Sequence, residues 1–259
     1  MAGSIELQKR GSLATVTISN PSRFNAMSRS MWRDLRDSFH KIHADDSLLA
    51  VVVVGRGHFC AGGDISEYAS FRFQEDSLRD FHETEVWGGL QAMLDCDVPI
   101  IAKIDGNCMG AGVEIASCCD IRIASESARF GAPIAKLGFP MAPREAALVM
   151  RAVGELTARE MLLSAAVLDA NEMKQRGFLN QVVAVDQLDS AVHVYTERMH
   201  TLAPRAANLN KQCFRALAPM DTAQEAIKRI AFAYRYADSY EHREGIAAFT
   251  EKRQPRFMA

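Results

Sequence analysis

Apolar and polar residues alternate at the start of the chain, over residues 5–10 and 13–18, and a Gly-Ser pair separates the two segments. Such alternation is typical of half-buried strands joined by a turn, so we expect an N-terminal β-hairpin. From Met27 to Ile42 the apolar side chains recur at helical spacing, which predicts an amphipathic helix. Ser28 is well placed to cap the start of that helix.

A continuous apolar run follows at residues 49–54, and two further strand-like runs lie at 99–104 and 120–124. Their β-branched composition and their length are typical of strands that are buried on both faces. Each of the first two runs leads into a glycine-rich loop, and the second loop leads into a short apolar helix. The order of strand, glycine loop and helix predicts an α/β fold with right-handed crossovers and with function at the loops that follow the strands.

The rest of the chain is predicted to be mainly helical. A polar helical stretch reaches about Asp95, and from Ala142 onward the helical pattern is interrupted by one strand-like segment at 178–185. The last sixty or so residues combine helical patterns with a central Pro204. Their apolar faces need a partner surface to cover them.

Composition and charge narrow the class of protein. A chain of 259 residues, 48% hydrophobic and 24% charged, is typical of a globular protein with a sizeable core. The net charge of −2 argues against the strong basic field that nucleic acids and anionic membranes attract, although a local patch is enough for a small anionic ligand. The absence of a secretory signal, of a membrane-spanning run and of any C-x-x-C pair among six cysteines predicts a cytoplasmic protein.

The two glycine-rich loops are the first candidates for a binding site. The loop at 55–64 lacks the residues of a P-loop and of a dinucleotide-binding loop, so a plain turn is a reasonable interpretation. The loop at 105–112 ends in Gly110, Ala111 and Gly112 and leads into a helix that has Glu114 in its first turn. Small residues let a ligand approach the N–H groups of the helix start, where negative charge is stabilised, but a glutamate there is also common without any function.

Metal and nucleophile sites find little support in the sequence. His40 and His43 lie three residues apart among polar neighbours, with no third ligand evident, which favours a solvated helix face. Cys60 and Cys108 lie in the two glycine-rich loops among small residues, which favours a packing role. We therefore expect no metal.

Five segments in order resemble the crotonase superfamily, also called the enoyl-CoA hydratase/isomerase family. The segments are NPSRFNAM (20–27), GRGHFCAGGDI (55–65), IDGNCMGAGVEIASCCDIRIA (104–124), FGAPIAKLGFP (130–140) and REGIAAFTEKRQPRF (243–257). Together they extend over almost the whole chain.

This resemblance implies an α/β fold built as a crotonase-like spiral of ββα turns. The spiral and its active site would occupy residues 1–195, and residues 196–259 would form a helical region that assembles homotrimers or hexamers as dimers of trimers. The implied activity is that of a lyase or isomerase of fatty acid metabolism acting on an acyl-CoA thioester. Coenzyme A would enter as part of the substrate, so no separate cofactor is expected.

The resemblance also implies roles for individual residues. The backbone N–H groups of Gly63 and Ala111 would form an oxyanion hole for the thioester oxygen of an enolate-like anion, and Glu114 would be the catalytic carboxylate. Residues that would bind the substrate or its coenzyme A moiety are Arg23, Ala26, Ala61, Gly63, Asp64, Ile65, Ser66, Ala111, Ile134, Phe249 and Lys252. In relatives, the residues at the positions of Phe249 and Lys252 commonly reach the coenzyme A of a neighbouring subunit. A solvated helix charge is the alternative for Lys252. Ser66 stands where familiar hydratases have lysine.

A second departure from the family pattern concerns the reaction. Typical hydratases have two glutamates, and the position of the second is occupied here by Ile134. Loss of a general acid or base costs roughly 10²- to 10⁴-fold in rate, so the replacement matters for water addition. An aliphatic residue there also predicts a drier pocket that raises the pKa of Glu114.

Three interpretations follow from this departure. The one we favour is a hydratase or isomerase in which Glu114 works alone or with another acid; the candidates are Glu67, Glu83, Glu85 and Glu145. A second is a different enolate chemistry, namely decarboxylation, thioester hydrolysis or double-bond migration. A third is a non-catalytic acyl-CoA-binding protein, against which the presence of Glu114 argues.

Overall fold

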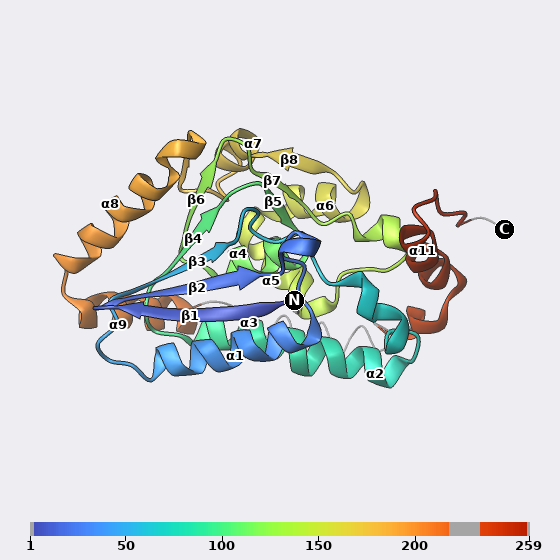
Figure 1. Cartoon of the computed structure of the whole chain (residues 1–259), viewed down its shortest axis with the longest axis horizontal. Helices are drawn as coiled ribbons and strands as arrows, with labels where there is room; N and C mark the ends of the chain where they lie inside the picture. Colours follow the sequence, from blue (N-terminus) through green and yellow to red (C-terminus); the bar gives the residue numbers. More distant parts are fainter. Residues whose placement is uncertain (1–2, 218–233, 258–259) are drawn as a thin grey trace.

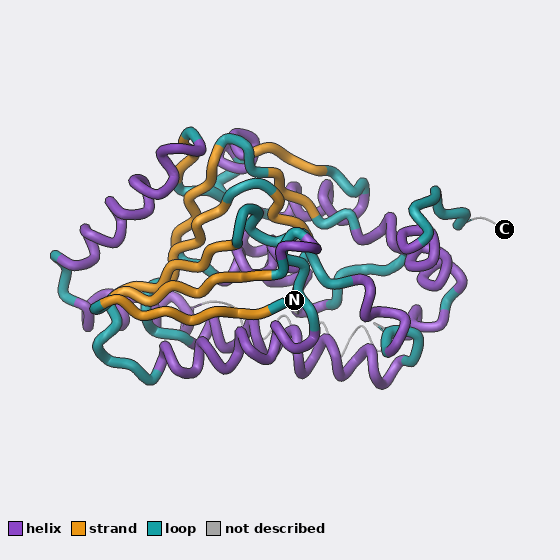
Figure 2. Tube along the Cα trace, viewed as in Figure 1, coloured by secondary structure: helices purple, strands orange, loops and turns teal. Residues whose placement is uncertain are grey.

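The computed structural model describes residues 3–217 and 234–257 and shows a central twisted sheet flanked by helices (Figures 1 and 2). The predicted hairpin is confirmed, because β1 pairs antiparallel with β2. Every following neighbour in the order β1-β2-β3-β4-β6-β9 is parallel. The strands are β1 (Ser4–Arg10), β2 (Leu13–Ser19), β3 (Ala50–Gly55), β4 (Ile100–Ile104), β6 (Ile121–Ser125) and β9 (Gln181–Val183). The predicted strand at 178–185 is therefore shorter than expected.

A second, smaller sheet was not predicted. Its strands are β5 (Asn107–Met109), β7 (Arg129–Gly131) and β8 (Val167–Asp169), in the order β5-β7-β8. The sequence suggested that the whole segment 105–112 is a loop, but residues 107–109 form strand β5. These three residues have no strong strand preference, and their strand geometry comes from pairing with β7, which is distant in sequence.

The buried strands separate two hydrophobic cores. In β3, Val51 and Val53 point into the larger core and Val52 into the smaller one, as expected for a strand covered on both faces. The larger core lies between the sheet and α1 (Arg29–His43) and α3 (Trp87–Asp95), and the smaller one is covered by α8 (Leu188–His200). Figure 1 shows α8 on one side of the sheet and α1 with α3 on the other.

The first long helix is confirmed together with its cap, since the Ser28 hydroxyl accepts a hydrogen bond from the N–H of Met31. The predicted helical stretch up to Asp95 is instead broken into four pieces. These are a 3₁₀ helix (Ile65–Ser70), α2 (Glu75–Asp80), a π-helical turn (Phe81–Val86) and α3. Single π turns are frequent at functional sites, and this one contributes to the cavity described below.

The remaining helices are α4 (Ala111–Cys118), α5 (Pro143–Val153), α6 (Glu155–Leu163), α7 (Ala170–Gln175), α9 (Pro204–Leu217) and α11 (Tyr240–Thr250). Pro204 does not interrupt a helix but begins α9, where a missing N–H costs nothing. Among the described residues, no helix combines the length and the apolar character that crossing a bilayer requires. Residues 218–233 of the predicted helical region 196–259 lie outside the described residues, and the predicted boundary at 195 falls within α8.

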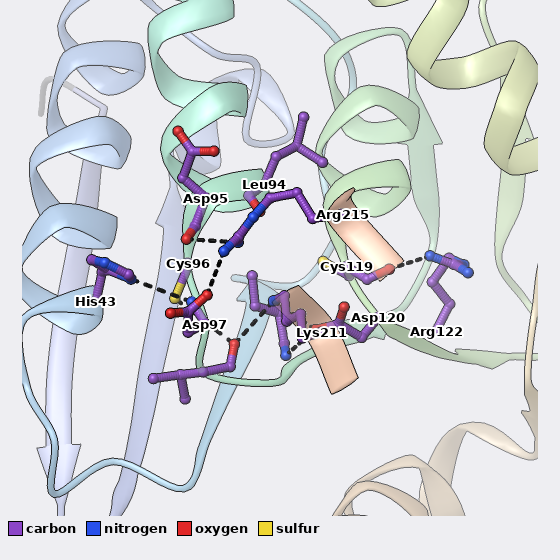
Figure 3. A network of polar contacts seen from close by, with 12 residues as sticks. His43, Leu94, Asp95, Cys96, Asp97, Cys119, Asp120, Arg122, Lys211 and Arg215 are labelled. Carbon is purple, nitrogen blue, oxygen red and sulfur yellow. Dashed lines mark hydrogen bonds and ion pairs between the residues drawn. The ribbon is translucent and has the colours of Figure 1, made fainter. Parts of the chain in front are cut away.

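Two cations attach α9 to the body of the protein (Figure 3). The ammonium of Lys211 donates to the carbonyl oxygen of Val98 at 3.0 Å and pairs with Asp120 at 2.8 Å. The guanidinium of Arg215 pairs with Asp97 at 2.6 Å. Lys211 is 9% exposed, so loss of its partner, or of its ammonium, would leave polar groups of this contact unpaired in a place with little access to water, which costs more than breaking a surface ion pair.

Removal of the Lys211 ammonium tests this attachment. We expect Lys211→Met to lower the free energy of unfolding by about 1–3 kcal/mol, because a half-buried carboxylate and a buried carbonyl lose their donor. Urea denaturation measures the change. Lys41→Met removes an exposed lysine of α1 and should stay within about 0.5 kcal/mol of the wild type. Equal losses in the two variants would contradict the assignment.

Candidate active site

A cavity of about 730 Å³ lies where the two glycine-rich loops meet the 3₁₀ helix Ile65–Ser70, the π turn and α11. Every residue to which the sequence assigned a catalytic or binding role lines this cavity. These residues are Arg23, Ala26, Ala61, Gly63, Asp64, Ile65, Ser66, Ala111, Glu114, Ile134, Phe249 and Lys252. The structure therefore brings together residues that are more than two hundred positions apart in sequence, while their individual roles stay predictions.

Backbone hydrogen bonds hold the two glycine-rich loops side by side. The N–H of Cys60 donates to the carbonyl of Asn107 at 2.8 Å, and the N–H of Met109 donates back to Cys60 at 2.8 Å. Gly112 permits this contact, because a Cβ at that position would lie 2.6 Å from the carbonyl oxygen of Cys60. Gly110 has φ 48° and ψ −111°, a conformation that residues with a side chain rarely adopt. The glycines are thus required by the loop geometry.

The same arrangement places two free backbone donors at the cavity. Ala111 is the first residue of α4, where no earlier turn supplies a carbonyl. Neither its N–H nor that of Gly63 has a hydrogen-bond acceptor among the described residues. Both residues line the cavity. The site can therefore stabilise negative charge on a ligand atom that lies between these donors.

Glu114 lies in the first turn of α4, three residues after Ala111, and also lines the cavity. Burial raises its pKa above the ordinary value, the charge of Glu145 raises it further, and the positive charge of Arg72 opposes the rise. The direction is the one expected from the sequence. A carboxyl group in this state can give and take a proton near neutral pH.

Of the other acidic candidates, two are engaged in structural contacts. Glu67 accepts a hydrogen bond from the backbone N–H of Arg29 at 2.8 Å. Glu85 forms ion pairs with Arg29 and Arg33 at 2.7 and 2.9 Å. Neither glutamate lines the cavity, so neither is placed to act instead of the second hydratase glutamate, whose position Ile134 occupies.

The third candidate, Glu83, is shared between two partners. The hydroxyl of Tyr234 donates to its carboxylate at 2.7 Å, and Arg144 pairs with it at 3.2 Å. Its negative charge is thus already neutralised by a guanidinium, and its side chain does not line the cavity.

Glu145 is connected to the cavity through a histidine. Its side chain is 2% exposed, and its Oε1 lies 3.0 Å from Nδ1 of His82. His82 belongs to the π turn and lines the cavity, and its Nε2 is buried without a hydrogen-bond partner among the described residues. Burial lowers the pKa of His82 well below its usual value and raises that of Glu145. The pair can therefore share a proton while both groups stay uncharged.

The sequence identified Glu145 only as one candidate of several and missed His82 and Arg72 altogether. Both missed residues lie in the segment between the first glycine-rich loop and α3, which has no motif and looks like an ordinary polar helix. Arg72 is 1% exposed and lines the cavity close to Glu114 and Glu145, whose pKa values its charge lowers. Arg72 lies in the turn between the 3₁₀ helix and α2, and His82 lies in the π turn, so both are in places where the expected regular helix is interrupted.

The raised pKa of the buried Glu145 carboxyl predicts that the free energy of unfolding depends on pH. A carboxyl whose pKa is raised in the folded protein contributes fully below the ordinary value of 4.5, and this contribution is lost as the pH rises through the raised pKa. Over that range of pH, we expect the free energy of unfolding of the wild type to fall by on the order of 1–3 kcal/mol and that of Glu145→Gln to fall by less. Chemical denaturation at a series of pH values measures both. Glu155→Gln, at an exposed site, should keep the wild-type slope, and a wild-type slope in Glu145→Gln would refute the prediction.

The cysteines and histidines of the metal and nucleophile hypotheses are not part of a reactive site. Cys60 and Cys108 are fully buried, and burial raises the pKa of Cys60 to about 12, as expected for packing residues. His40 and His43 are exposed, as predicted. Within the part of the chain that the structure describes, no three His, Cys, Asp or Glu side chains are grouped as metal ligands.

The mouth of the cavity carries the exposed cations Arg23, Lys136 and Lys252. Arg23 lies 3.2 Å from Asp64, which in turn accepts a hydrogen bond from the hydroxyl of Ser66 at 2.7 Å. Phe249 lies in the last turn of α11, and Lys252 lies just after the end of this helix. Both line the cavity of their own chain. A locally positive rim thus exists on a chain of net charge −2.

Comparisons with known proteins agree with this picture. Residues 8–259 match the family model described as enoyl-CoA hydratase/isomerase. The chain is 31% identical to the short-chain-enoyl-CoA hydratase of Clostridium acetobutylicum, over 97% of this chain and 96% of that protein. It is 29% identical to the crotonyl-CoA hydratase of Syntrophomonas wolfei, over 99% and 98% of the two chains.

Solved structures with the same fold include an enoyl-CoA hydratase/carnithine racemase from Magnetospirillum magneticum, with a TM-score of 0.81 and 35% identity over 98% of this chain and 95% of that one. A methylmalonyl-CoA decarboxylase in complex with 2-nitronate-propionyl-CoA has a TM-score of 0.87 over 98% of both chains. Its identity is 22%, so this second likeness concerns the fold alone.

Proposed function

The chain belongs to the enoyl-CoA hydratase/isomerase family, and we propose that it acts on acyl-CoA thioesters by stabilising a thioester enolate. The observation that carries the proposal is the position of Glu114, one turn after the free N–H of Ala111 and at the same cavity as the free N–H of Gly63. A proton-transfer group and two backbone donors therefore serve one bound ligand.

In the proposed reaction, the thioester oxygen accepts hydrogen bonds from Gly63 and Ala111. Negative charge develops on this oxygen when a proton leaves the α-carbon or when a nucleophile adds to the conjugated double bond. Each preorganised donor can contribute on the order of 10²- to 10³-fold in rate. Glu114 carries the proton to or from the α-carbon, for which its raised pKa is suited. We favour a hydratase or isomerase reaction.

We assign the missing second proton-transfer group to the pair of His82 and Glu145. Nε2 of His82 is unpartnered among the described residues, and Glu145 at Nδ1 can replace or accept the proton that His82 exchanges. This pair occupies a different element from Ile134, so the geometry of water activation differs from that of a two-glutamate site. The assignment rests on the contact between His82 and Glu145 and on the position of His82 in the cavity lining.

A second candidate is a decarboxylase or thioester hydrolase of the same superfamily. Ile134 favours the decarboxylase of these two, because loss of carbon dioxide forms the same enolate without any water to activate, whereas thioester hydrolysis consumes a water. The non-catalytic acyl-CoA-binding protein is the least favoured, since a pure binding site has no use for a buried carboxyl group, Glu114, beside the donors that would hold the thioester.

Assembly and location are further parts of the proposal. Phe214 and Leu217 near the end of α9 are 71% and 82% exposed, which supports burial of this helical region against sister subunits. We therefore retain the homotrimer or dimer of trimers, working in the cytoplasm, that the sequence predicts. Light scattering after size-exclusion chromatography measures the assembly.

The reaction is tested with a panel of thioesters and mass spectrometry. The purified protein is incubated with crotonyl-CoA, a 3-enoyl-CoA and methylmalonyl-CoA, each with wild type and with Glu114→Gln. Hydration adds water, decarboxylation removes carbon dioxide, hydrolysis frees coenzyme A, and isomerisation changes the absorbance without changing mass. Absence of any change in all thioesters, together with tight binding, would overturn the enzyme proposal in favour of the binding protein.

A further inference from the structure

Arg72 has an environment that is unusual for a charged side chain. The residue is 1% exposed, and its guanidinium lies 4.3 Å from the ring centroid of Tyr68 and 4.1 Å from that of Phe139. Two aromatic rings therefore contact the guanidinium group, which leaves its N–H edges as the directions in which it can bind.

Those edges are largely unused in the protein. One guanidinium nitrogen donates to the hydroxyl of Tyr236 at 3.3 Å, and Nε is buried without any hydrogen-bond partner among the described residues. Within the same part of the chain, no carboxylate lies at ion-pair distance from Arg72, although the neighbouring, partly exposed Arg144 is paired with Glu83. A buried charge without a partner costs several kcal/mol, so such a group is expected where a ligand completes it.

The nearby glutamates do not supply the missing partner. Glu114 and Glu145 influence Arg72 electrostatically but form no ion pair with it. Burial raises the pKa of both, so each tends to keep its proton and to remain uncharged. Two further acidic side chains of this region, Glu83 and Glu85, are paired with other arginines.

Arg72 also differs in exposure from the cations that would meet the phosphates of coenzyme A. The cations of the mouth, Arg23, Lys136 and Lys252, are exposed. Arg72 instead shares the buried part of the cavity with apolar side chains such as Trp32, Phe81 and Val86, which are 1–3% exposed. An acyl chain held at Gly63 and Ala111 would thus extend among apolar walls that contain one unpaired cation.

We infer that Arg72 binds a second carboxylate on the acyl chain, so that the substrate class is the monothioester of a dicarboxylic acid with coenzyme A. The inference rests on the proposed acyl-CoA function and specifies its substrate. A carboxylate matches the planar fork of a guanidinium and can occupy Nε together with a neighbouring N–H. It also supplies the negative charge that this part of the cavity lacks.

Binding of unreactive thioesters tests the inference without depending on turnover. Glutaryl-CoA and adipyl-CoA are compared with the analogues in which the terminal carboxylate is an amide of the same length, by calorimetry on the full-length protein. For at least one of the two chain lengths, wild type should bind the carboxylate thioester about ten- to a hundredfold more tightly than the amide analogue, as expected of a charge-assisted hydrogen bond. In Arg72→Gln this ratio should fall to near one, and Arg72→Lys should keep part of it.

A matched control uses another cation of the same cavity. Lys136→Gln removes a charge at the mouth and should weaken carboxylate and amide thioesters alike, leaving their ratio at the wild-type value. A wild-type ratio within about threefold at both lengths, or a ratio that survives in Arg72→Gln, would overturn the inference while leaving acyl-CoA binding intact. If none of the thioesters binds to wild type, the proposed function itself fails. Circular dichroism confirms that each variant is folded, and the Lys variant decides the matter if Arg72→Gln is not.

Discussion

Glu114→Gln should lower kcat about 10²- to 10⁴-fold, because the variant keeps the size and shape of the side chain but has no carboxyl proton to exchange. The loss should appear in kcat more than in KM, since the backbone donors that hold the thioester are unchanged. The raised pKa of Glu114 shows that its folded environment favours the uncharged form, so the neutral amide should also be tolerated structurally. Steady-state kinetics with the thioester that wild type converts measures the effect.

The matched control for this variant is Glu85→Gln. Glu85 is 8% exposed and holds two arginines outside the cavity, so its replacement should lower the melting temperature but leave kcat within about threefold. Wild-type turnover in Glu114→Gln would refute the role of Glu114 as proton carrier. Turnover that is lost equally in both variants would indicate that the effect arises from damage to the fold.

Ala111→Val should reduce turnover on the order of 10²- to 10³-fold, the contribution of one oxyanion donor. Ala111 is the first residue of α4, and its side chain is next to the N–H that the thioester oxygen must approach to within about 3 Å. A larger, β-branched side chain keeps that oxygen away without removing the N–H itself. Activity should therefore fall far more than the melting temperature does.

Ala135→Val provides the comparison, because Ala135 is exposed in the 3₁₀ helix Ile134–Leu137 and does not line the cavity. This change should leave turnover close to that of wild type. Proportionate losses of stability and activity in Ala111→Val would argue against the oxyanion role and in favour of a packing role.

The parts of the fold that could be predicted from the sequence are those with strong local patterns. The hairpin, the helix capped by Ser28 and the strands at 49–54 and 99–104 appear close to the expected positions. Their periodicity reports directly which face is buried. The glycines of the two loops were equally informative, because they are needed where one backbone passes within contact distance of another.

What the sequence could not show depends on contacts between distant segments. Strands β5, β7 and β8 have three residues each and exist only because they pair with one another. Arg72 lies in a turn after a 3₁₀ helix and His82 lies in a π turn, and neither interruption of the helical pattern has a marker in the sequence. The family motif identified Gly63, Ala111 and Glu114, but it contains no information on residues that belong to this chain's own version of the site.

The cavity takes its walls from residues spread between Arg23 and Lys252. During synthesis, therefore, nearly the whole chain must leave the ribosome before the binding site can exist, and no shorter product holds a working portion of it. Pairing between parallel strands that are far apart in sequence also slows folding. The cavity is thus completed only late in folding, and the apolar and glycine-rich segments that form it are exposed to chaperones and proteases until then.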